Sequence, residues 1–141
     1  MSETLLVDTG AWIALFDPTE QHHNVISEYA DLIESAHLVV PWPVTYETLR
    51  TRFVRRPVWV AALNKRFSKS SVTFIDDTTY YRDAYSLTVE SSIQHKRDLS
   101  MVDMLCRLII DDPKIDIKYL LTVNKKDFYD VCGNNGVEIW P

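Results

Sequence analysis

Cysteine and long apolar runs are both scarce in this sequence. It has two cysteines among 141 residues, and Cys106 and Cys132 have neither a CxxC partner nor a nearby cysteine–histidine cluster. A zinc site is therefore disfavoured, and a reduced, cytoplasmic setting is expected. No run approaches the ~18 apolar residues of a membrane span, and no basic segment precedes an apolar run at the amino terminus. We expect neither a transmembrane helix nor a signal peptide.

An excess of basic residues is also lacking, because 20 acidic side chains outnumber 15 basic ones and give a net charge of −5. This net negative charge argues mildly against nucleic-acid binding that relies on the overall charge of the protein. It does not argue against a site that binds cations, since four carboxylates in one pocket would themselves contribute about four negative charges. Charge alone leaves open whether the chain acts on nucleic acid.

What the sequence does contain is an alternation of short apolar, β-rich runs with longer segments of helical periodicity. Strands separated by helices imply parallel pairing. We therefore predict one domain over residues 1–141, an α/β fold with a three-layer α/β/α sandwich around a central, mostly parallel sheet of about five strands. The predicted strands are 4–7, 38–40, 72–75, 119–123 and 137–140. The predicted helices are 11–16, 21–35 with Asp17 or Thr19 near its cap, 45–56, 57–67, 78–95 and 100–110, and residues 133–136 are read as a turn.

Four carboxylates stand where such a fold would bring them together. Asp8 follows the first predicted strand directly, and Asp127, with Asn124 before it, follows the fourth. Glu47 lies near the predicted start of the helix after the second strand, and Asp103 in the first turn of the helix at 100–110. Since reactive sites of open parallel sheets lie beyond the carboxyl ends of the strands, we expect these side chains to converge at one edge.

Grouped carboxylates repel one another at neutral pH unless cations or protons intervene. Oxygen ligands without His or Cys favour Mg²⁺ or Mn²⁺, and such sites suit phosphodiester hydrolysis. Each residue alone also has a structural interpretation, because Asp at a strand end or helix start is commonly a cap. Ser100 and Asp103 in particular have the spacing of a capping box, with Asp in place of Glu.

Four segments that contain these residues resemble the motifs of the PIN-domain family, particularly the toxins of bacterial VapBC-type toxin–antitoxin pairs. The first motif, an Asp followed by a hydroxyl residue and an apolar helix, corresponds to Leu6–Leu15, and the second, a Glu in a helix, corresponds to Tyr46–Leu49. The third, a Ser three residues before an Asp, corresponds to Leu99–Leu105. The fourth, Thr-x-Asn-x-x-Asp-Phe, lies within Leu121–Phe128. Gly10 departs from the pattern, since the family usually has Ser or Asn there, and Thr9 is the candidate to replace that polar contact.

The resemblance implies a Mg²⁺- or Mn²⁺-dependent endoribonuclease. It makes Asp8 and Asp103 the principal metal ligands, has Glu47 hold a second metal or orient water, and lets Asp127 complete the site, with Asn124 as the alternative. Thr9, Ser100 and Thr122 would orient these groups. It further implies RNA as substrate, a small antitoxin as partner and a homodimer. A solitary RNA-processing nuclease and a non-enzymatic PIN-like binding module are the alternatives.

Basic residues near these motifs are candidates for RNA contacts. Arg50 follows Glu47 by about one helical turn, and Lys125 lies beside Asp127. The competing interpretation of the arginines at 50, 52, 55 and 56 is a solvated helix face. His22 and His23 have no partner at metal-ligand spacing, which favours an exposed or capping role.

Two other enzyme classes share the local pattern around Asp8. Asp-Thr-Gly also occurs in retroviral-type aspartic proteases, but those need Gly-rich flaps and many short strands, whereas this chain has three glycines and long helical segments. Haloacid-dehalogenase-like phosphatases need a second Asp two residues after the first, where this chain has Gly10. Both classes are therefore disfavoured.

Overall fold

Five parallel strands form the centre of the computed structural model, which describes residues 3–141. They lie in the order β3-β2-β1-β4-β5, with each neighbouring pair parallel. The strands are β1 (Thr4–Val7), β2 (His37–Pro41), β3 (Val72–Ile75), β4 (Tyr119–Leu121) and β5 (Glu138–Trp140). The sheet grows from β1 towards β3 on one side and from β4 towards β5 on the other. The order in which strands are added to the sheet therefore reverses at the β1–β4 pair.

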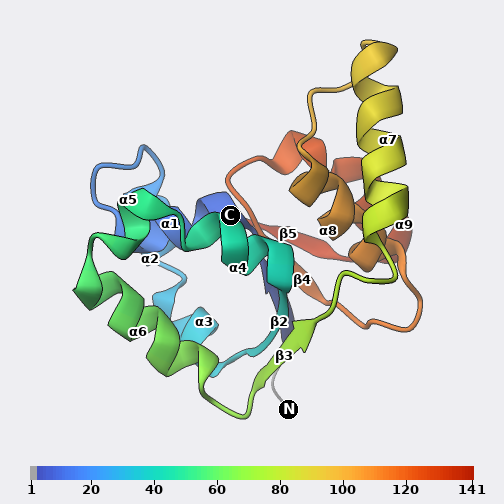
Figure 1. Cartoon of the computed structure of the whole chain (residues 1–141). Helices are drawn as coiled ribbons and strands as arrows, with labels where there is room; N and C mark the ends of the chain where they lie inside the picture. Colours follow the sequence, from blue (N-terminus) through green and yellow to red (C-terminus); the bar gives the residue numbers. More distant parts are fainter. Residues whose placement is uncertain (1–2) are drawn as a thin grey trace.

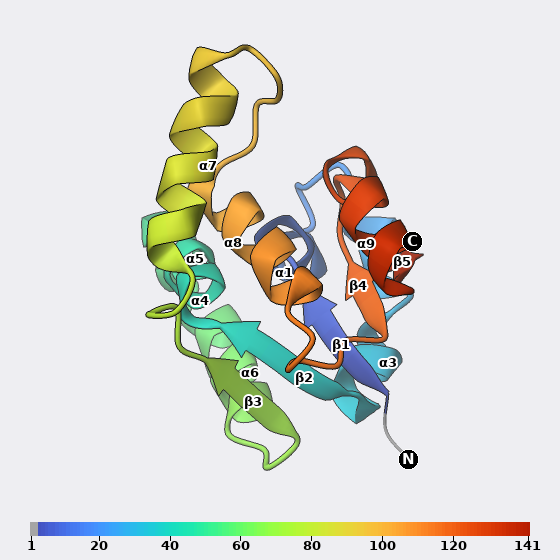
Figure 2. The same cartoon turned by 90° about the vertical axis from the view of Figure 1, so that its right-hand side faces the viewer.

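The helices form a layer on each side of this sheet (Figure 1). One layer holds α1 (Thr9–Phe16), α2 (His23–Ser27), α3 (Ala30–Ser35), α4 (Trp42–Thr48), α5 (Thr51–Val54) and α6 (Pro57–Phe67). The other holds α7 (Tyr81–Ile93), α8 (Met101–Asp111) and α9 (Tyr129–Asn135), with the 3₁₀ turn η1 (Lys125–Asp127) leading into α9. In Figure 2, α8 and α9 lie in front of the sheet, and α3 and α6 lie behind it. The three-layer α/β/α sandwich predicted from the sequence is confirmed.

The core lies on both faces of the central strands. Leu5, Leu6 and Val7 of β1 are all buried, as expected for a parallel strand that is covered on both sides. Trp12 of α1 packs edge-on against Phe67 of α6, with ring centroids 5.3 Å apart. Within the part of the chain that the structure describes, no helix is long and apolar enough to cross a membrane.

Several predicted boundaries are wrong. The helix predicted at 21–35 is two helices, α2 and α3, and neither Asp17 nor Thr19 caps it: Asp17 ends α1, and its carboxylate accepts from the backbone N–H of Thr19 at 2.9 Å. The helix predicted at 45–56 starts earlier and breaks in two. Pro43 lies in the first turn of α4, where a missing N–H costs nothing, and the extended backbone of Arg50 separates α4 from α5.

The turn predicted at 133–136 is wrong as well, because Gly133 belongs to helix α9. Glycine and asparagine are poor helix formers, so the sequence hides this helix. It is fixed by tertiary packing, since Val131 and Cys132 are buried, and it ends at Gly136, whose φ of 66° is the left-handed conformation that favours glycine. The predicted helix at 57–67 and the predicted strands at 4–7 and 72–75 are confirmed at both ends.

An ion pair joins α8 to α9. Arg107 donates from its two terminal nitrogens to the two carboxylate oxygens of Asp130, at 2.8 and 2.7 Å. It also donates to the carbonyl oxygen of Asp127 at 2.7 Å. The hydrogen bonds from Arg107 hold the pKa of Asp130 well below its usual range.

We predict that Asp130→Asn lowers the free energy of unfolding by about 1 kcal/mol at pH 7. The expected loss is small because half of the Asp130 side chain is exposed, so solvent screens the ion pair. Because the folded pKa lies below the unfolded value, the stabilisation is present above about pH 4 and is lost as the pH falls towards the folded pKa. Urea unfolding from pH 7 to pH 2 measures this, with Glu138→Gln as the control. A difference that does not shrink at low pH would contradict the assignment.

Candidate active site

Asp8 lies at the point where the order of the sheet reverses. Its backbone N–H donates to the carbonyl oxygen of Leu121 at the end of β4, at 3.0 Å, so the ends of β1 and β4 are held side by side. In open parallel sheets this switch point is where ligands bind. The side chain of Asp8 accepts from the N–H of Thr9 at 2.8 Å and from the hydroxyl of Thr122 at 3.1 Å. One of its bonds therefore caps α1 and the other crosses to the segment after β4.

The carboxyl of Asp8 is almost fully buried, with 3% of the residue exposed. Burial raises its pKa to about 6, and the nearby negative charges of Asp103 and Glu47 act in the same direction. The hydrogen bonds from Thr9 and Thr122 oppose this shift without cancelling it. In residues 3–141 no Lys or Arg forms an ion pair with Asp8, so its charge is not compensated by the protein.

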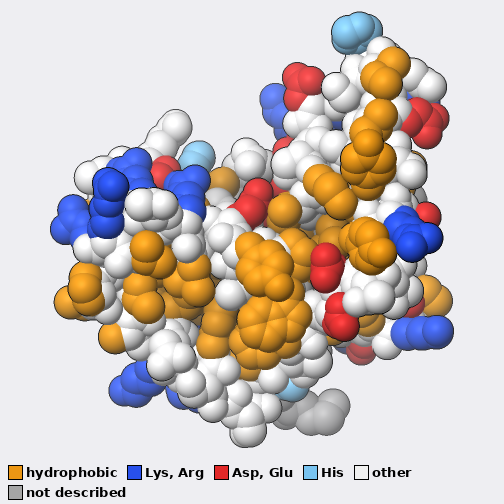
Figure 3. Space-filling view, in the orientation of Figure 1, with side chains coloured by type: hydrophobic (Ala, Val, Ile, Leu, Met, Phe, Trp, Pro, Cys, Tyr) orange, Lys and Arg blue, Asp and Glu red, His pale blue; other side chains and the backbone are white. Residues whose placement is uncertain are grey.

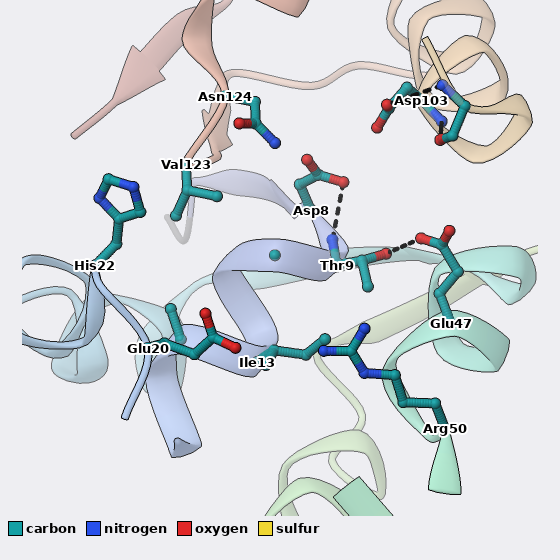
Figure 4. A pocket seen from close by; sticks show the side chains of 13 residues that line it. Asp8, Thr9, Ile13, Glu20, His22, Glu47, Arg50, Asp103, Val123 and Asn124 are labelled. Carbon is teal, nitrogen blue, oxygen red and sulfur yellow. Dashed lines mark hydrogen bonds between the residues drawn. The ribbon is translucent and has the colours of Figure 1, made fainter. Parts of the chain in front are cut away.

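Glu47 reaches the same place from helix α4. It lies in the last turn of this helix rather than near its start, because α4 begins at Trp42. The hydroxyl of Thr9 donates to Glu47 Oε1 at 2.7 Å. Thr9 therefore links the two acids, through its N–H to Asp8 and through its hydroxyl to Glu47 (Figure 4).

Asp103 comes from the opposite helical layer and has a capping role in the structure. Its carboxylate accepts from the N–H of Ser100 at 3.2 Å, while the Ser100 hydroxyl accepts from the N–H of Asp103 at 3.1 Å. The capping box predicted from the sequence is therefore confirmed. Asp103 still faces Asp8 across the cavity closely enough to raise the pKa of Asp8.

The remaining candidates after β4 divide between two places. Asn124 lines the cavity that contains Asp8, and its backbone N–H donates to the Thr122 hydroxyl at 3.1 Å. Asp127 does not line that cavity but lines a neighbouring one, as does Lys125. Burial and the charge of Asp103 raise the pKa of Asp127. Of the two residues considered for the fourth position, Asn124 is the one that the structure brings beside Asp8.

Asp8, Glu47, Asp103 and Asn124 all line one cavity of about 300 Å³, here called the acidic cavity. In Figure 3 acidic side chains lie in the hollow between the α5 side of the molecule and the α7 side, and Lys and Arg side chains gather over α5. Arg50 lines the cavity but makes no ion pair with Glu47. The cavity is lined by Asp8, Thr9, Gly10, Ile13, Ala14, Glu20, His22, Glu47, Arg50, Ser100, Asp103, Val123 and Asn124.

Sequence reasoning missed one acidic residue of this cavity. Glu20 lies in the loop between α1 and α2 and points towards the cavity beside Ile13 (Figure 4). It follows no strand and starts no helix, so nothing in the sequence places it at the carboxyl edge of the sheet. His22 is exposed and stands at the N-cap position of α2, as expected, and it also lines the cavity.

The donor set has the chemistry of a hard-cation site. It offers the carboxylates of Asp8, Glu47 and Asp103 with the amide oxygen of Asn124, and it has an uncompensated negative charge. As the side chains stand in residues 3–141, no three His, Cys, Asp or Glu groups are spaced to hold one ion together. Glu47 is directed to Thr9 and Asp103 to its own helix cap. The residues fit such an ion by type and charge, and each of these two carboxylates can ligate through the oxygen that does not accept from Thr9 or Ser100.

No protein-family model matches this sequence, and no curated protein matches it significantly.

Gly10 has a steric reason to be glycine. A Cβ added there would lie 2.9 Å from Cγ2 of Val123, which is closer than such atoms approach in proteins. Val123 lies directly after Thr122, so this contact sets the distance between α1 and the segment after β4. Thr9, the candidate to replace the polar contact expected at position 10, directs its hydroxyl to Glu47 and contacts Asp8 through its backbone N–H.

We predict that Gly10→Ala lowers the free energy of unfolding by about 1 kcal/mol, because overpacking outweighs the better helix propensity of alanine. In a Val123→Ala background the obstructing methyl is gone, so the same substitution should be stabilising. Chemical unfolding of the two single variants and the double variant forms a cycle that measures this. A Gly10→Ala effect of equal sign and size in both backgrounds would refute the contact.

We predict that Asp8→Asn raises the free energy of unfolding by about 2 kcal/mol at pH 7 in a chelator. The folded pKa of Asp8, about 6, lies above the unfolded value. Ionisation therefore destabilises the fold above pH 6, and the gain from Asn should vanish as the pH falls to about 4. Thermal unfolding measures the difference, and Asp83→Asn on α7 is the control. A lower stability of Asp8→Asn in chelator at pH 7 would contradict this account.

Proposed function

We propose that this protein is a metal-dependent ribonuclease of the PIN-domain kind, with its active site in the acidic cavity. One observation carries the proposal: Asp8, Glu47, Asp103 and Asn124 come from four separate segments and line one cavity at the switch point of a parallel sheet. The resemblance of the four motifs supports the same conclusion from the sequence. The confirmed sandwich fold is compatible with it but does not by itself imply a function.

Each residue has a distinct role in this proposal. Asp8 and Asp103 hold Mg²⁺ or Mn²⁺, and Glu47 and Asn124 hold a second ion or orient the attacking water. Such ions, when bound, neutralise charge on the phosphate and polarise it for attack. Thr9 and Thr122 keep the oxygens of Glu47 and Asp8 in position through their hydroxyl groups. Arg50, on the rim of the cavity, contacts an RNA phosphate.

The biological setting that we propose is that of a toxin in a type II toxin–antitoxin pair. The protein would act in the cytoplasm, form a homodimer and be held inactive by a small antitoxin. The support is the resemblance of the motifs, in family order along the whole chain. A neighbouring reading frame for a small DNA-binding protein would separate a toxin from a solitary RNA-processing nuclease.

We predict that Asp8→Asn and Asp103→Asn each reduce Mg²⁺- or Mn²⁺-dependent cleavage of a structured RNA at least about 100-fold, because each removes a charged ligand. Asn124→Ala should cost about tenfold and Asp127→Asn less, since only Asn124 lines the acidic cavity. Gel-resolved cleavage of end-labelled RNA measures these effects. Asp111→Asn, at the far end of α8, is the matched control.

Metal binding provides the second measurement for this site. Calorimetric titration with Mn²⁺ should show weaker binding by Asp8→Asn than by wild type, with the Asp111→Asn control unchanged. If neither Asp8→Asn nor Asp103→Asn reduced cleavage, the nuclease proposal would fail. RNA binding without cleavage would leave the non-enzymatic binding module as the function.

A further inference from the structure

A second cavity, of about 560 Å³, opens beside the acidic cavity. It is here called the basic cavity, and its lining consists of His22, Thr122, Val123, Asn124, Lys125, Lys126, Asp127, Tyr129 and Pro141. Three of these residues, His22, Val123 and Asn124, also line the acidic cavity. In Figure 4 they stand on the side of the acidic cavity away from Glu47. The two cavities are therefore neighbouring parts of one groove.

The two parts of this groove differ in charge. Four carboxylates and one arginine line the acidic cavity. Two lysines and one carboxylate line the basic cavity, and neither lysine forms an ion pair within residues 3–141. A polyanion that reaches the acidic cavity through this groove would pass the ammonium groups of Lys125 and Lys126.

The turn that carries the two lysines is held in place from behind. The guanidinium of Arg97 donates to the carbonyl oxygen of Lys126 at 3.0 Å, and that of Arg107 donates to the carbonyl oxygen of Asp127 at 2.7 Å. Both arginines also contact Asp130, which fixes them in turn. The backbone of η1 is thus ordered before any ligand binds, while its lysine side chains remain exposed. Preorganisation of this kind lowers the entropy cost of binding.

An aromatic ring lies at the same cavity. Tyr129, the first residue of α9, is 59% exposed and lines the basic cavity two residues after Asp127. Exposed aromatic rings beside a positively charged groove are the features on which unpaired bases stack. A paired base could not present its face to such a ring without leaving its helix.

We propose that the basic cavity is a nucleotide subsite, in which Lys125 and Lys126 bind the phosphates and Tyr129 stacks on the base of the nucleotide next to the one in the acidic cavity. This inference rests on the proposed ribonuclease function, since it concerns the same RNA strand. It assigns Arg107 and Arg97 as positioning residues, which act through the backbone of η1 and do not touch the RNA. Asp127 lines this second subsite and not the acidic cavity.

The test is RNA binding by the full chain without cleavage. Asp8→Asn protein in a chelator is titrated against a fluorescein-labelled single-stranded RNA of about ten nucleotides, and anisotropy is followed at several salt concentrations. Adding Lys125→Ala and Lys126→Ala should weaken binding about tenfold and reduce the slope of log K against log salt by about 1.4, as expected for two phosphate contacts on a single strand. Lys65→Ala with Lys114→Ala removes two exposed lysines elsewhere and should change neither quantity comparably.

The stacking contact has its own pair of variants. Tyr129→Ala should weaken binding about tenfold, whereas Tyr129→Phe, which keeps the ring, should bind as the parent does. Tyr85→Ala on α7 is the control, since this tyrosine is equally exposed at 61%. With an RNA probe whose bases are replaced by abasic sites, Tyr129→Ala should have no effect, because nothing remains to stack.

Two results would overturn the subsite: lysine variants that bind with the parent's affinity and salt slope, or Tyr129→Phe and Tyr129→Ala that lose affinity equally. Absence of any RNA binding by the parent would overturn it too, and would leave a protein partner as the occupant of the groove.

Failure of the subsite proposal can be distinguished from failure of the nuclease proposal. Lysine-dependent binding without metal-dependent cleavage keeps the subsite and rejects the nuclease, whereas cleavage with unchanged binding by the variants rejects the subsite alone.

Discussion

The pairing of β1 with β4 is the constraint on which the rest of the site depends. These two strands are separated by more than a hundred residues in sequence, yet the bond from the N–H of Asp8 to Leu121 continues their ladder to the edge of the sheet. Because the sheet grows in opposite directions from this pair, its connecting helices lie on opposite faces and no crossover covers the strand ends. The acidic cavity is the space that this topology leaves open.

The fold keeps at this edge a buried charge that does not stabilise it. Asp8 is as buried as the apolar residues of β1, and only neutral donors contact it, so its ionised form is disfavoured. A purely structural cap would serve as well with Asn or Ser, which carry no charge. Destabilising charge that is retained where strand ends meet is typical of functional sites. A ligand-binding role for Asp8 is therefore favoured over a capping role alone, whereas for Asp103 the capping box is a sufficient structural reason.

Local sequence signals were enough to predict the architecture and part of the site. Asp8 could be placed because a strand end is visible as an apolar run, and Ser100 with Asp103 because a capping box has a fixed spacing. Glu47 was placed near the start of its helix but lies in the last turn, because α4 begins at Trp42 and the extended backbone at Arg50 follows it, and no local pattern marks either boundary. Helix α9 and the position of Glu20 were not predicted, because no local sequence pattern indicates them. Helix α9 is fixed by the burial of Val131 and Cys132, and Glu20 is brought to the cavity by the path of its loop.

Whether Asn124 or Asp127 completes the candidate site could not be decided from the motif alone. Thr-x-Asn-x-x-Asp offers two polar side chains three residues apart, and the charge of the Asp127 carboxylate made it the preferred cation ligand from the sequence alone. The turn η1 separates them, because Arg107 of α8 and Arg97 of the loop before α8 bind its carbonyl oxygens. Asn124 stays beside Thr122 at the strand end, while Asp127 is carried into the neighbouring cavity with the lysines. The geometry of one short turn thus decides which of the two residues lines the acidic cavity and which lines the basic cavity.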